Sequence, residues 1–343
     1  MSEIRLGLIG AGAVGALHAQ AVRATPGVTV TAVCDIAPAA ARALAEPFGA
    51  AAFAEHGALI ASGLVDAVVV NTPHSLHTEI VRASAAAGLH VLVEKPMAIT
   101  SRDCELMAQA CEQAGVVLAV GHIQHTLPPM AAAKEALERG RIGALTAIDD
   151  WRSTDYRPGT RPDWFFDPAV SGGGVFMNIG AHCVDRVLWL TDRPLASVAA
   201  SSAYRTGSRV ETDVQARLEF ADGLCAHIRV TSAPLPTRNE IVLFGETGTI
   251  RICTETGAVL YPHDSAAWGS KTVLAAPEPT DVPEAFATQL AAFAATVRGE
   301  SPALVDARHG RRVIEVIEAV YAACRTGRPQ RPREAAALVG RDG

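Results

Sequence analysis

The sequence predicts an α/β protein built from a doubly wound parallel sheet, followed by an α+β domain with a large mixed or antiparallel sheet. Three observations lead to this prediction. A chain of 343 residues exceeds what one compact core usually supports, so two domains are expected. The N-terminal third alternates short apolar runs with alanine-rich helical runs, and β-rich runs separated by turn residues follow later in the chain.

Five apolar runs predict the strands of the parallel sheet. They are IRLGLIG, VTVTAVCD, LVDAVVVNTP, HVLVEKP and GVVLAVGH. Each run is almost entirely apolar, as expected for strands that are covered by helices on both faces. Helices are predicted between them at residues 14–24, 38–46, 75–87 and 101–114, and Gly88 and Gly115 provide C-cap signals for the last two.

The second part begins its β-rich pattern near residue 144. Turn residues such as Asp222 and Gly223 separate the runs ALTAIDDW, LASVAASSAY, VQARLEF, LCAHIRVT, EIVLFGETGTIRIC and GAVLYP. Two closing helices are predicted at residues 283–298 and 307–325. We expect the domain junction near residues 121–129, with residues 1–122 forming the first domain and residues 123–343 the second.

Composition excludes several classes of partner. The net charge is -6 and no basic tract occurs, which argues against nucleic acid or an anionic membrane. No apolar run approaches the roughly 18 residues of a membrane span, and the start MSEIRLGLIG lacks the layout of a signal peptide. The seven cysteines are scattered and form no C-x-x-C pair, which predicts reduced thiols rather than a zinc site. We expect a cytoplasmic protein with a small-molecule ligand.

The loop after the first predicted strand has the pattern G-x-G-x-x-G. Gly10 permits a tight turn, Gly12 lets the backbone approach a pyrophosphate, and Gly15 lets helix and strand pack closely. The helix that starts at Ala13 and Val14 presents amide groups and the positive end of its dipole. This context predicts a dinucleotide-binding Rossmann domain.

Asp35 ends the second predicted strand about 20 residues beyond the glycines, where a carboxylate can hold both hydroxyls of an adenosine ribose. No arginine or lysine follows it until Arg42. Since the carboxylate would repel a 2'-phosphate, we expect NAD rather than NADP.

A lysine stands at the end of another predicted strand. In the run VLVEKP, Lys95 lies at the carboxyl end of a parallel strand, where ligands bind in open α/β sheets. A partly desolvated lysine beside a cationic nicotinamide would have a lowered pKa, as a general acid or base near neutral pH requires.

Several separated motifs occur in an order typical of one family. They are GAGAVGALHAQAV at residues 10–22, VVVNTPHSLHTEIVRASAAAGLHVLVEKPMA at 68–98 and SGGGVFMNIGAHCVD at 171–185, followed by the helical C-terminal segment. With these motifs the chain resembles the Gfo/Idh/MocA oxidoreductases, which include glucose-fructose oxidoreductase and inositol dehydrogenase. The resemblance implies hydride transfer between NAD(P) and a secondary alcohol or ketone of a sugar or cyclitol, in a homodimer or homotetramer.

The resemblance also assigns roles to residues. Lys95 matches the family's catalytic lysine and His182 its active-site histidine, and Pro96 matches a proline often preceded by a cis bond. His125 stands where many relatives carry an arginine. The walls of the nicotinamide-ribose site would come from Glu94, Asn71, Thr72, Pro73, His74 and His77.

A predicted helix over residues 175–190 places Asn178, His182 and Asp185 on one face. Many relatives have aspartate where this chain has Asn178, whose amide cannot accept a proton but can bind a hydroxylated substrate. Proton transfer would then fall to Lys95, His182 or both, and Asp185 can orient His182. We expect the preceding glycines to let this helix start close to the nicotinamide.

The stretch WRSTDYRPGTRPDWFFDP at residues 151–168 is a polar and aromatic loop. Tyr156, Arg157, Arg161 and Trp164 can stack on a sugar ring or pair with an anionic group, or they can instead pin the loop or an oligomer contact. His125 and the neighbouring His122, like His74 and His77, lack a cysteine or carboxylate at a ligand-like interval, so no metal site is predicted.

Together these features favour an NAD-dependent dehydrogenase that acts on a polyhydroxylated compound. Reduction of a keto-sugar, including one linked to a nucleotide, is the same chemistry in the other direction. A non-catalytic sensor that binds NAD and a ligand is the alternative from another class, and the loss of the aspartate and of the arginine gives it weight. Retention of Lys95 and His182 favours the enzyme.

Overall fold

The computed structural model describes residues 3–205, 207–233, 237–263, 269–278 and 281–332. The chain forms two compact units, and each is described by itself. The first contains residues 1–126 and 282–311, and the second contains residues 127–281 and 312–343. None of the described helices is both long and apolar enough to cross a membrane.

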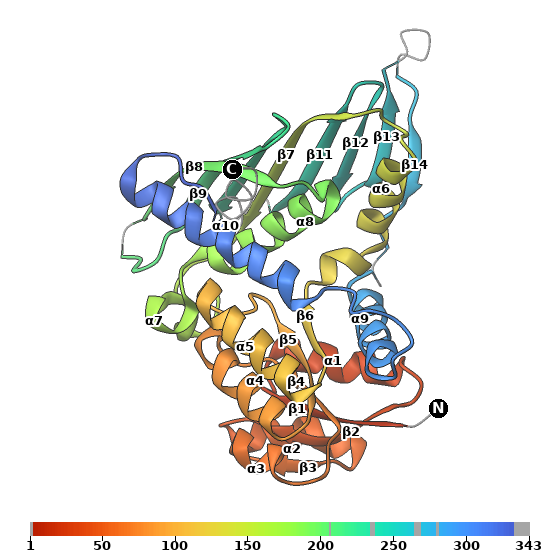
Figure 1. Cartoon of the computed structure of the whole chain (residues 1–343), viewed down its shortest axis with the longest axis vertical. Helices are drawn as coiled ribbons and strands as arrows, with labels where there is room; N and C mark the ends of the chain where they lie inside the picture. The colour runs from red at the N-terminus through yellow and green to blue at the C-terminus, as the bar shows by residue number, and fades with distance from the viewer. Residues whose placement is uncertain (1–2, 206, 234–236, 264–268, 279–280, 333–343) are drawn as a thin grey trace. The chain divides into compact units, whose positions relative to one another are not determined.

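The first unit has a parallel sheet, which in the described residues has six strands in the order β3-β2-β1-β4-β5-β6. The strands are β1 (Ile4–Ile9), β2 (Val28–Cys34), β3 (Ala51–Phe53), β4 (Ala67–Val70), β5 (His90–Glu94) and β6 (Leu118–Gly121). Strand order reverses beside β1, so the carboxyl ends of β1 and β4 flank the crevice where α/β sheets bind ligands. The predicted doubly wound sheet is therefore confirmed (Figure 1).

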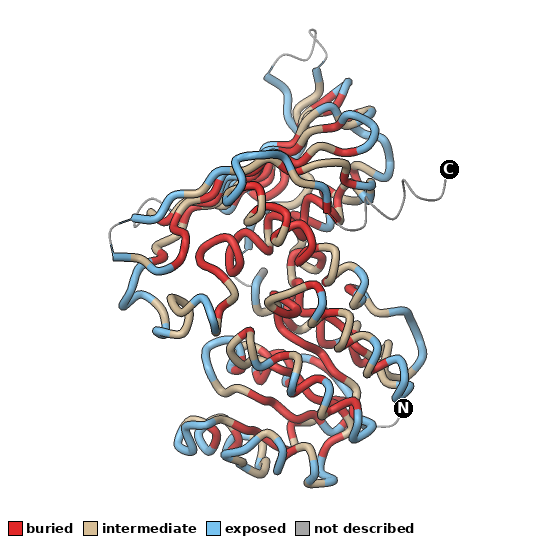
Figure 2. Tube along the Cα trace, turned by 60° about the vertical axis from the view of Figure 1, so that its left-hand side comes forward, coloured by how far each residue is buried: buried red, intermediate tan, exposed pale blue. Residues whose placement is uncertain are grey.

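Helices alternate with these strands along the chain. They are α1 (Ala13–Arg23), α2 (Pro38–Ala45), α3 (His56–Ile60), α4 (His77–Ala86) and α5 (Ser101–Ala114), with 3-10 turns η1 (Glu46–Phe48), η2 (His74–Leu76) and η3 (Ile123–Thr126). The sequence did not predict β3 and α3, because three and five residues are too short to show a periodic pattern. Figure 2 shows buried residues running through the strands of this sheet.

Helix α9 (Asp281–Val297) returns the chain to the first unit. Its buried residues Phe286, Leu290 and Phe293 join the same core as β1 and β2. The second domain expected at residues 123–343 is therefore not continuous, because the apolar face of α9 completes the core of the first unit.

The second unit has a mixed sheet, with eight described strands in the order β14-β13-β12-β11-β7-β10-β9-β8. The strands are β7 (Leu145–Thr154), β8 (Leu195–Ala203), β9 (Asp213–Phe220), β10 (Cys225–Ser232), β11 (Arg238–Gly245), β12 (Gly248–Cys253), β13 (Gly257–Pro262) and β14 (Thr272–Ala275). All neighbours are antiparallel except β7 and β10, which are parallel. The predicted large mixed sheet is confirmed.

The remaining helical segments complete the chain. They are α6 (Pro128–Glu138), η4 (Asp163–Phe166), α7 (Pro168–Ser171), a π-helical turn η5 (Phe176–Gly180), α8 (Ala181–Thr191) and α10 (Ala307–Thr326). Within the second unit, α6 and α8 pack on the sheet. The sequence did not predict α6, because its two prolines indicated a break, whereas proline in the first turn of a helix starts it.

Candidate active site

The glycine loop between β1 and α1 is shaped by close backbone contacts. Gly10 has φ +102, and a Cβ there would lie 2.6 Å from the carbonyl oxygen of Asn71. A Cβ on Gly15 would lie 2.2 Å from the carbonyl oxygen of Gly10. At Gly12 a Cβ would meet nothing within 4 Å, and no side chain caps the start of α1. Gly10 and Gly15 thus shape the loop, whereas a side chain at Gly12 would enter open space.

Asp35 follows β2 and lies against this loop. Its Oδ2 accepts a hydrogen bond from the amide of Ala11 at 2.8 Å, and its Oδ1 accepts one from the amide of Ala37 at 2.8 Å. These bonds fix the carboxylate beside the turn, and each oxygen keeps a lone pair for a hydroxyl. The next residue, Ile36, is 92% exposed.

Asn71 and Thr72 follow β4 beside the same loop. Within the described residues, both amide atoms of Asn71 and the hydroxyl of Thr72 are buried without a hydrogen-bond partner. A Cβ on Gly15 would lie 3.8 Å from the amide nitrogen of Asn71. Because buried polar groups are normally satisfied, these three atoms indicate a bound polar partner. Together with the open space at Gly12 and the uncapped start of α1, they fit a dinucleotide.

Glu94 ends β5 and belongs to a buried pair. His18 of α1 donates from Nε2 to Glu94 Oε1 at 2.9 Å, and the amide of Lys95 donates to Oε2 at 3.1 Å. A Cβ on Gly121 would lie 2.9 Å from Oε1, so this glycine makes room for the carboxylate. Burial raises the pKa of Glu94, but the hydrogen bond from His18 and the charges of His18 and Lys95 outweigh it and hold the pKa below its ordinary value.

Lys95 lies directly after β5 and is partly exposed, and its bond to Pro96 is cis. The carboxylate of Glu94 is thus bound by His18 and by the amide of Lys95, and its expected place in the wall of the nicotinamide-ribose site stays a prediction. His18 was missed because its partner lies 76 residues away and no local pattern marks it.

His77 supports the turn that follows Lys95. Its Nδ1 lies 3.1 Å from the carbonyl oxygen of Pro96 and its Nε2 lies 3.0 Å from that of Thr72. The side chain is fully buried, and burial lowers its pKa although the carbonyls oppose this. His77 thus holds two backbone segments together, and its expected place in the wall of the nicotinamide-ribose site stays a prediction. His74 is also buried, with its ring edge-on to that of His77.

His125 lies in η3 and is buried among other rings of the first unit. It and His122 each lie edge-on to His309, with ring centroids 5.3 and 6.1 Å apart respectively.

The glycine run of the second unit is packed against buried side chains. A Cβ on Gly173 would lie 2.1 Å from the hydroxyl of Tyr321, and one on Gly174 would lie 2.2 Å from the carbonyl oxygen of Glu211. The lack of side chains at these two glycines therefore leaves room for Tyr321 and Glu211. The sequence had suggested a different reason, namely that the glycines let the helix start close to the nicotinamide.

Glu211 anchors the start of the site helix. Its carboxylate accepts hydrogen bonds from the amide of Gly174 at 2.8 Å, the amide of Phe176 at 3.0 Å and the hydroxyl of Tyr321 at 2.8 Å. Burial raises the pKa of Glu211, while these hydrogen bonds oppose the shift. The anchored segment is η5, a π-helical turn, so Asn178 is out of the regular α-helical register with His182 and Asp185.

Tyr156 links the loop before the glycines to this helix. It is buried, hydrogen-bonds with the side chain of Asn178, and donates to the carbonyl oxygen of Phe165 at 3.3 Å. The guanidinium of Arg161 lies over the Tyr156 ring, 5.0 Å from its centroid. Trp164 stacks on Phe165 with centroids 3.7 Å apart. The structure thus brings together Asn178, Tyr156 and Arg161.

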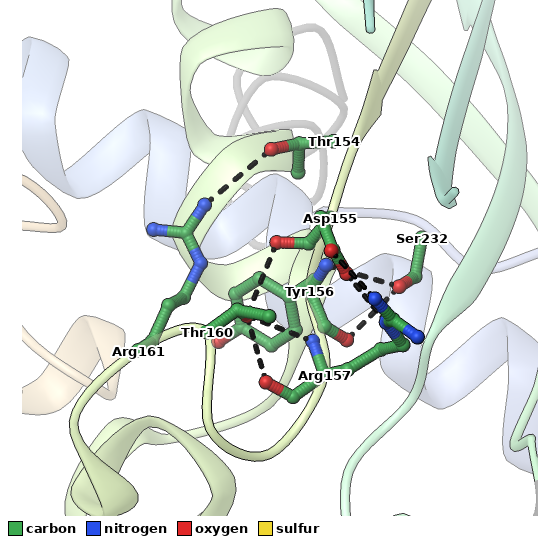
Figure 3. A network of polar contacts seen from close by, with 7 residues as sticks. All are labelled: Thr154, Asp155, Tyr156, Arg157, Thr160, Arg161 and Ser232. Carbon is green, nitrogen blue, oxygen red and sulfur yellow. Dashed lines mark hydrogen bonds and ion pairs between the residues drawn. The ribbon is translucent and has the colours of Figure 1, made fainter. Parts of the chain in front are cut away.

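Arg157 points away from this group (Figure 3). It is exposed and forms a two-pronged ion pair with Asp155, with nitrogen to oxygen distances of 2.6 and 2.8 Å. This ion pair gives Arg157 a role in shaping the loop, and its expected role in substrate binding stays a prediction. His182 is partly exposed, whereas Asp185 is fully buried.

Two family models match the chain. Residues 4–122 match a family described as "Oxidoreductase family, NAD-binding Rossmann fold", and residues 130–251 match the Gfo/Idh/MocA C-terminal domain. The chain belongs to the Gfo/Idh/MocA family of oxidoreductases. Its first unit is therefore an NAD-binding Rossmann domain, and the chain is an oxidoreductase, as the sequence predicted.

This chain is similar to several dehydrogenases of the family and to a solved structure with bound NAD. Inositol 2-dehydrogenase of Rubrobacter xylanophilus is 28% identical over 96% of this chain and 93% of its own length. D-xylose 1-dehydrogenase (NADP(+)) 2 of Haloferax volcanii is 30% identical over 84% of this chain and 87% of its own. The solved structure of GenD2 from gentamicin A biosynthesis, in complex with NAD, is 25% identical with a TM-score of 0.86, over 96% of this chain and 97% of its own.

Proposed function

We propose that this oxidoreductase is an NAD-dependent dehydrogenase that oxidises a secondary hydroxyl of a sugar, cyclitol or related polyhydroxylated compound. The observation that carries the proposal is the carboxyl edge of the first sheet. There the open space at Gly12, the side-chain amide of Asn71, which has no hydrogen-bond partner among the described residues, and Lys95 follow the neighbouring strands β1, β4 and β5. The sugar and cyclitol relatives support the substrate class.

Asp35 supports NAD as the preferred cofactor. Its carboxylate is fixed by Ala11 and Ala37 and would repel a 2'-phosphate, and Arg42 is exposed on α2. When bound, NAD supplies the carbon that accepts the hydride. The chain's own part is to hold it through Asp35, the start of α1 and the polar atoms that follow β4.

Lys95 is the proposed general base. It takes the proton of the substrate hydroxyl as the hydride leaves, and His182 orients the hydroxyl and shares the proton. Asn178 binds a neighbouring oxygen with its amide, with Tyr156 fixing the direction of that amide. Glu94 keeps a negative charge beside Lys95.

Activity of the Lys95→Met variant tests this assignment. A panel of sugars and cyclitols, assayed with NAD and NADP at 340 nm, first identifies the substrate. We expect Lys95→Met to lower kcat at least about 10²-fold, because general acid or base catalysis typically contributes this much. Binding of NAD, measured by titration calorimetry, should stay close to that of the parent.

Two results would contradict the proposal. A kcat within about threefold of the parent would remove Lys95 from the chemistry. A tenfold or larger preference for NADP in kcat/KM would overturn the argument from Asp35. Binding of NAD without any substrate-dependent change at 340 nm would instead indicate a sensor.

We also propose a cytoplasmic homodimer or homotetramer. All seven cysteines are free thiols, which favours a reducing compartment. The face of the large sheet that carries Trp151, Arg229 and Arg217 has a groove and an exposed aromatic ring, and it is the proposed interface. The net charge of -6 supports a small-molecule substrate rather than nucleic acid or a membrane.

A further inference from the structure

Three arginines lie close together on the side of β7 that faces α8. One of them, Arg186 of α8, is fully paired. It donates from Nε to Asp150 Oδ2 at 2.6 Å, from Nη2 to Asp150 Oδ1 at 2.5 Å and from Nη1 to Asn239 Oδ1 at 2.8 Å. This buried ion pair uses both oxygens of Asp150 and leaves the other two arginines, Arg152 and Arg161, without that carboxylate.

Arg152 is two residues beyond Asp150 on β7, so its side chain emerges from the same face of the sheet. Its Nη1 is buried and has no hydrogen-bond partner among the described residues, and no ion pair to Arg152 occurs there. Burial lowers the pKa of Arg152, and the like charges of Arg186 and Arg161 lower it further. Interactions with Cys183 and Asp150 act in the opposite direction and raise the pKa of Arg152. An arginine nevertheless stays protonated in proteins, so the guanidinium of Arg152 keeps its positive charge.

Arg161 approaches the same face from the loop that follows β7. Its Nη2 donates to the hydroxyl of Thr154 at 3.5 Å, and Thr154 is two residues beyond Arg152 (Figure 3). Its Nε is buried and unpartnered within the described residues. The rings of Tyr156 and Phe165 lie 5.0 and 5.8 Å from its guanidinium carbon and hold it in place. Burial also lowers the pKa of Arg161.

The carboxylates near these two arginines are engaged elsewhere. Asp150 pairs with Arg186, and Asp155 pairs with Arg157. Glu211 accepts from Gly174, Phe176 and Tyr321. Two partly desolvated guanidinium groups thus share one region, and among the described residues neither Arg152 nor Arg161 forms an ion pair with a carboxylate.

We propose that Arg152 and Arg161 bind an anionic group, a carboxylate or a phosphate, carried by the polyhydroxylated substrate. The inference rests on the proposed function and narrows its substrate class to sugar acids or sugar phosphates. A guanidinium presents paired N–H donors that match the oxygens of either anion. Removing water from the pair strengthens this attraction, and an unpaired buried cation destabilises the free protein. Arg161 lies against Tyr156, which contacts Asn178, so the anion would bind beside the proposed substrate amide.

Anion binding to the NAD-loaded protein tests the inference. The probes are D-glucuronate, D-galacturonate, D-glucose 6-phosphate and inorganic phosphate, each compared with D-glucose by titration calorimetry. We expect at least one anion to bind the parent at least about tenfold more tightly than Arg152→Met binds it, since charge-assisted hydrogen bonds are the stronger ones. Tight uronate binding assigns a carboxylate and tight phosphate binding assigns a phosphate. Arg139→Gln, which changes an exposed arginine of the same unit, is the control and should bind like the parent.

Thermal unfolding separates binding from a structural role. Without added anion, we expect Arg152→Met to raise Tm, because methionine removes a partly buried cation whose Nη1 has no hydrogen-bond partner among the described residues, and it keeps most of the side-chain volume. A lower Tm for Arg152→Met with unchanged anion binding would overturn the inference. So would equal binding of every anion by parent and variant.

Turnover distinguishes this inference from the proposed function. If neutral sugars are oxidised with NAD as efficiently as their uronates and phosphates, the dehydrogenase stands and the anion site fails. If an anion binds through Arg152 but no compound in the panel changes the absorbance at 340 nm, the site stands and the dehydrogenase fails.

Discussion

At the scale of single residues, Asn178 shows how burial favours a neutral amide. It is 5% exposed, hydrogen-bonds with Tyr156, and shares that tyrosine's surroundings with the buried carboxylate of Glu211. An aspartate at this position would place a second buried carboxylate in one region, and like charges there are unfavourable. Arg161, whose guanidinium lies over the ring of Tyr156, is a nearby cation that would offset part of this repulsion.

The glycine loop gives a sharp contrast between two substitutions. Gly12→Ala adds a methyl group into open space, so the Tm without NAD should match that of the parent. Binding of NAD should weaken at least about tenfold, because the methyl group would occupy the position of the pyrophosphate. Gly15→Ala places its Cβ 2.2 Å from the Gly10 carbonyl oxygen and should destabilise the fold by about 1–3 kcal/mol. Thermal unfolding with and without NAD measures both. Unchanged NAD binding by Gly12→Ala would refute the proposed phosphate position.

The residues that sequence predicted are those marked by a local pattern. Gly10, Asp35 and Lys95 each directly follow an apolar strand, whose end is visible in the sequence, and the spacing of G-x-G-x-x-G marks Gly12 and Gly15 at the start of α1. His18 and Glu211 could not be predicted in this way, because they act on residues 76 and 35 positions away. Arg152 resembles any other polar residue of an alternating strand until its missing partner is seen.

At the scale of elements, the site helix departs most from the sequence expectation. A regular helix was predicted over residues 175–190, but the first turn is π-helical over Phe176–Gly180. The apolar periodicity that predicts a helix does not reveal its hydrogen-bond pattern, which here depends on the carboxylate of Glu211 at Gly174 and Phe176. Short elements such as β3 and β14 were missed because their pairing with longer strands, rather than their own pattern, defines them.

Gly174 is the position where this anchor is most sensitive. In Gly174→Ala the Cβ would lie 2.2 Å from the Glu211 carbonyl oxygen, which is backbone and cannot rotate away. We expect a loss of about 3 kcal/mol or more in the free energy of unfolding, at the upper end for overpacking. Gly57→Ala is the matched control, because it lies in helix α3 with nothing within 4 Å, and alanine there should stabilise by about 0.5–1 kcal/mol. Urea unfolding measures both, and equal effects would show that Gly174 is not constrained.

At the scale of the whole molecule, the chain divides its chemistry between two units. The sequence predicted the two architectures because parallel and antiparallel sheets have different hydrophobic patterns. It could not predict that α9 completes the first core, since an apolar helix face does not indicate which sheet it covers. For the large sheet, one face is covered by α6 and α8, and the role of the opposite face has to be explained. Strand register places Trp151, Glu240 and Arg229 on one side of β7, β11 and β10, opposite to the buried side that carries Asp150.

This outer face is large enough for a stable dimer. Eight described strands about 4.8 Å apart, with a mean length of about seven residues, give a face of about 900 Å², and a standard interface buries about 800 Å² on each partner. Its partly buried Val242 and Phe244 provide apolar contact area, and its arginines provide the polar rim typical of interfaces. We expect Phe244→Glu to shift the protein from dimer or tetramer towards monomer, because the interface would bury a carboxylate without a partner. The Tm should fall only by the amount that association contributed to it. Sedimentation velocity at several concentrations measures this. Leu64→Glu, which changes a similarly apolar residue that is 38% exposed in the first unit, should sediment like the parent. If Phe244→Glu keeps the parent's mass and concentration dependence, the interface lies elsewhere on the molecule.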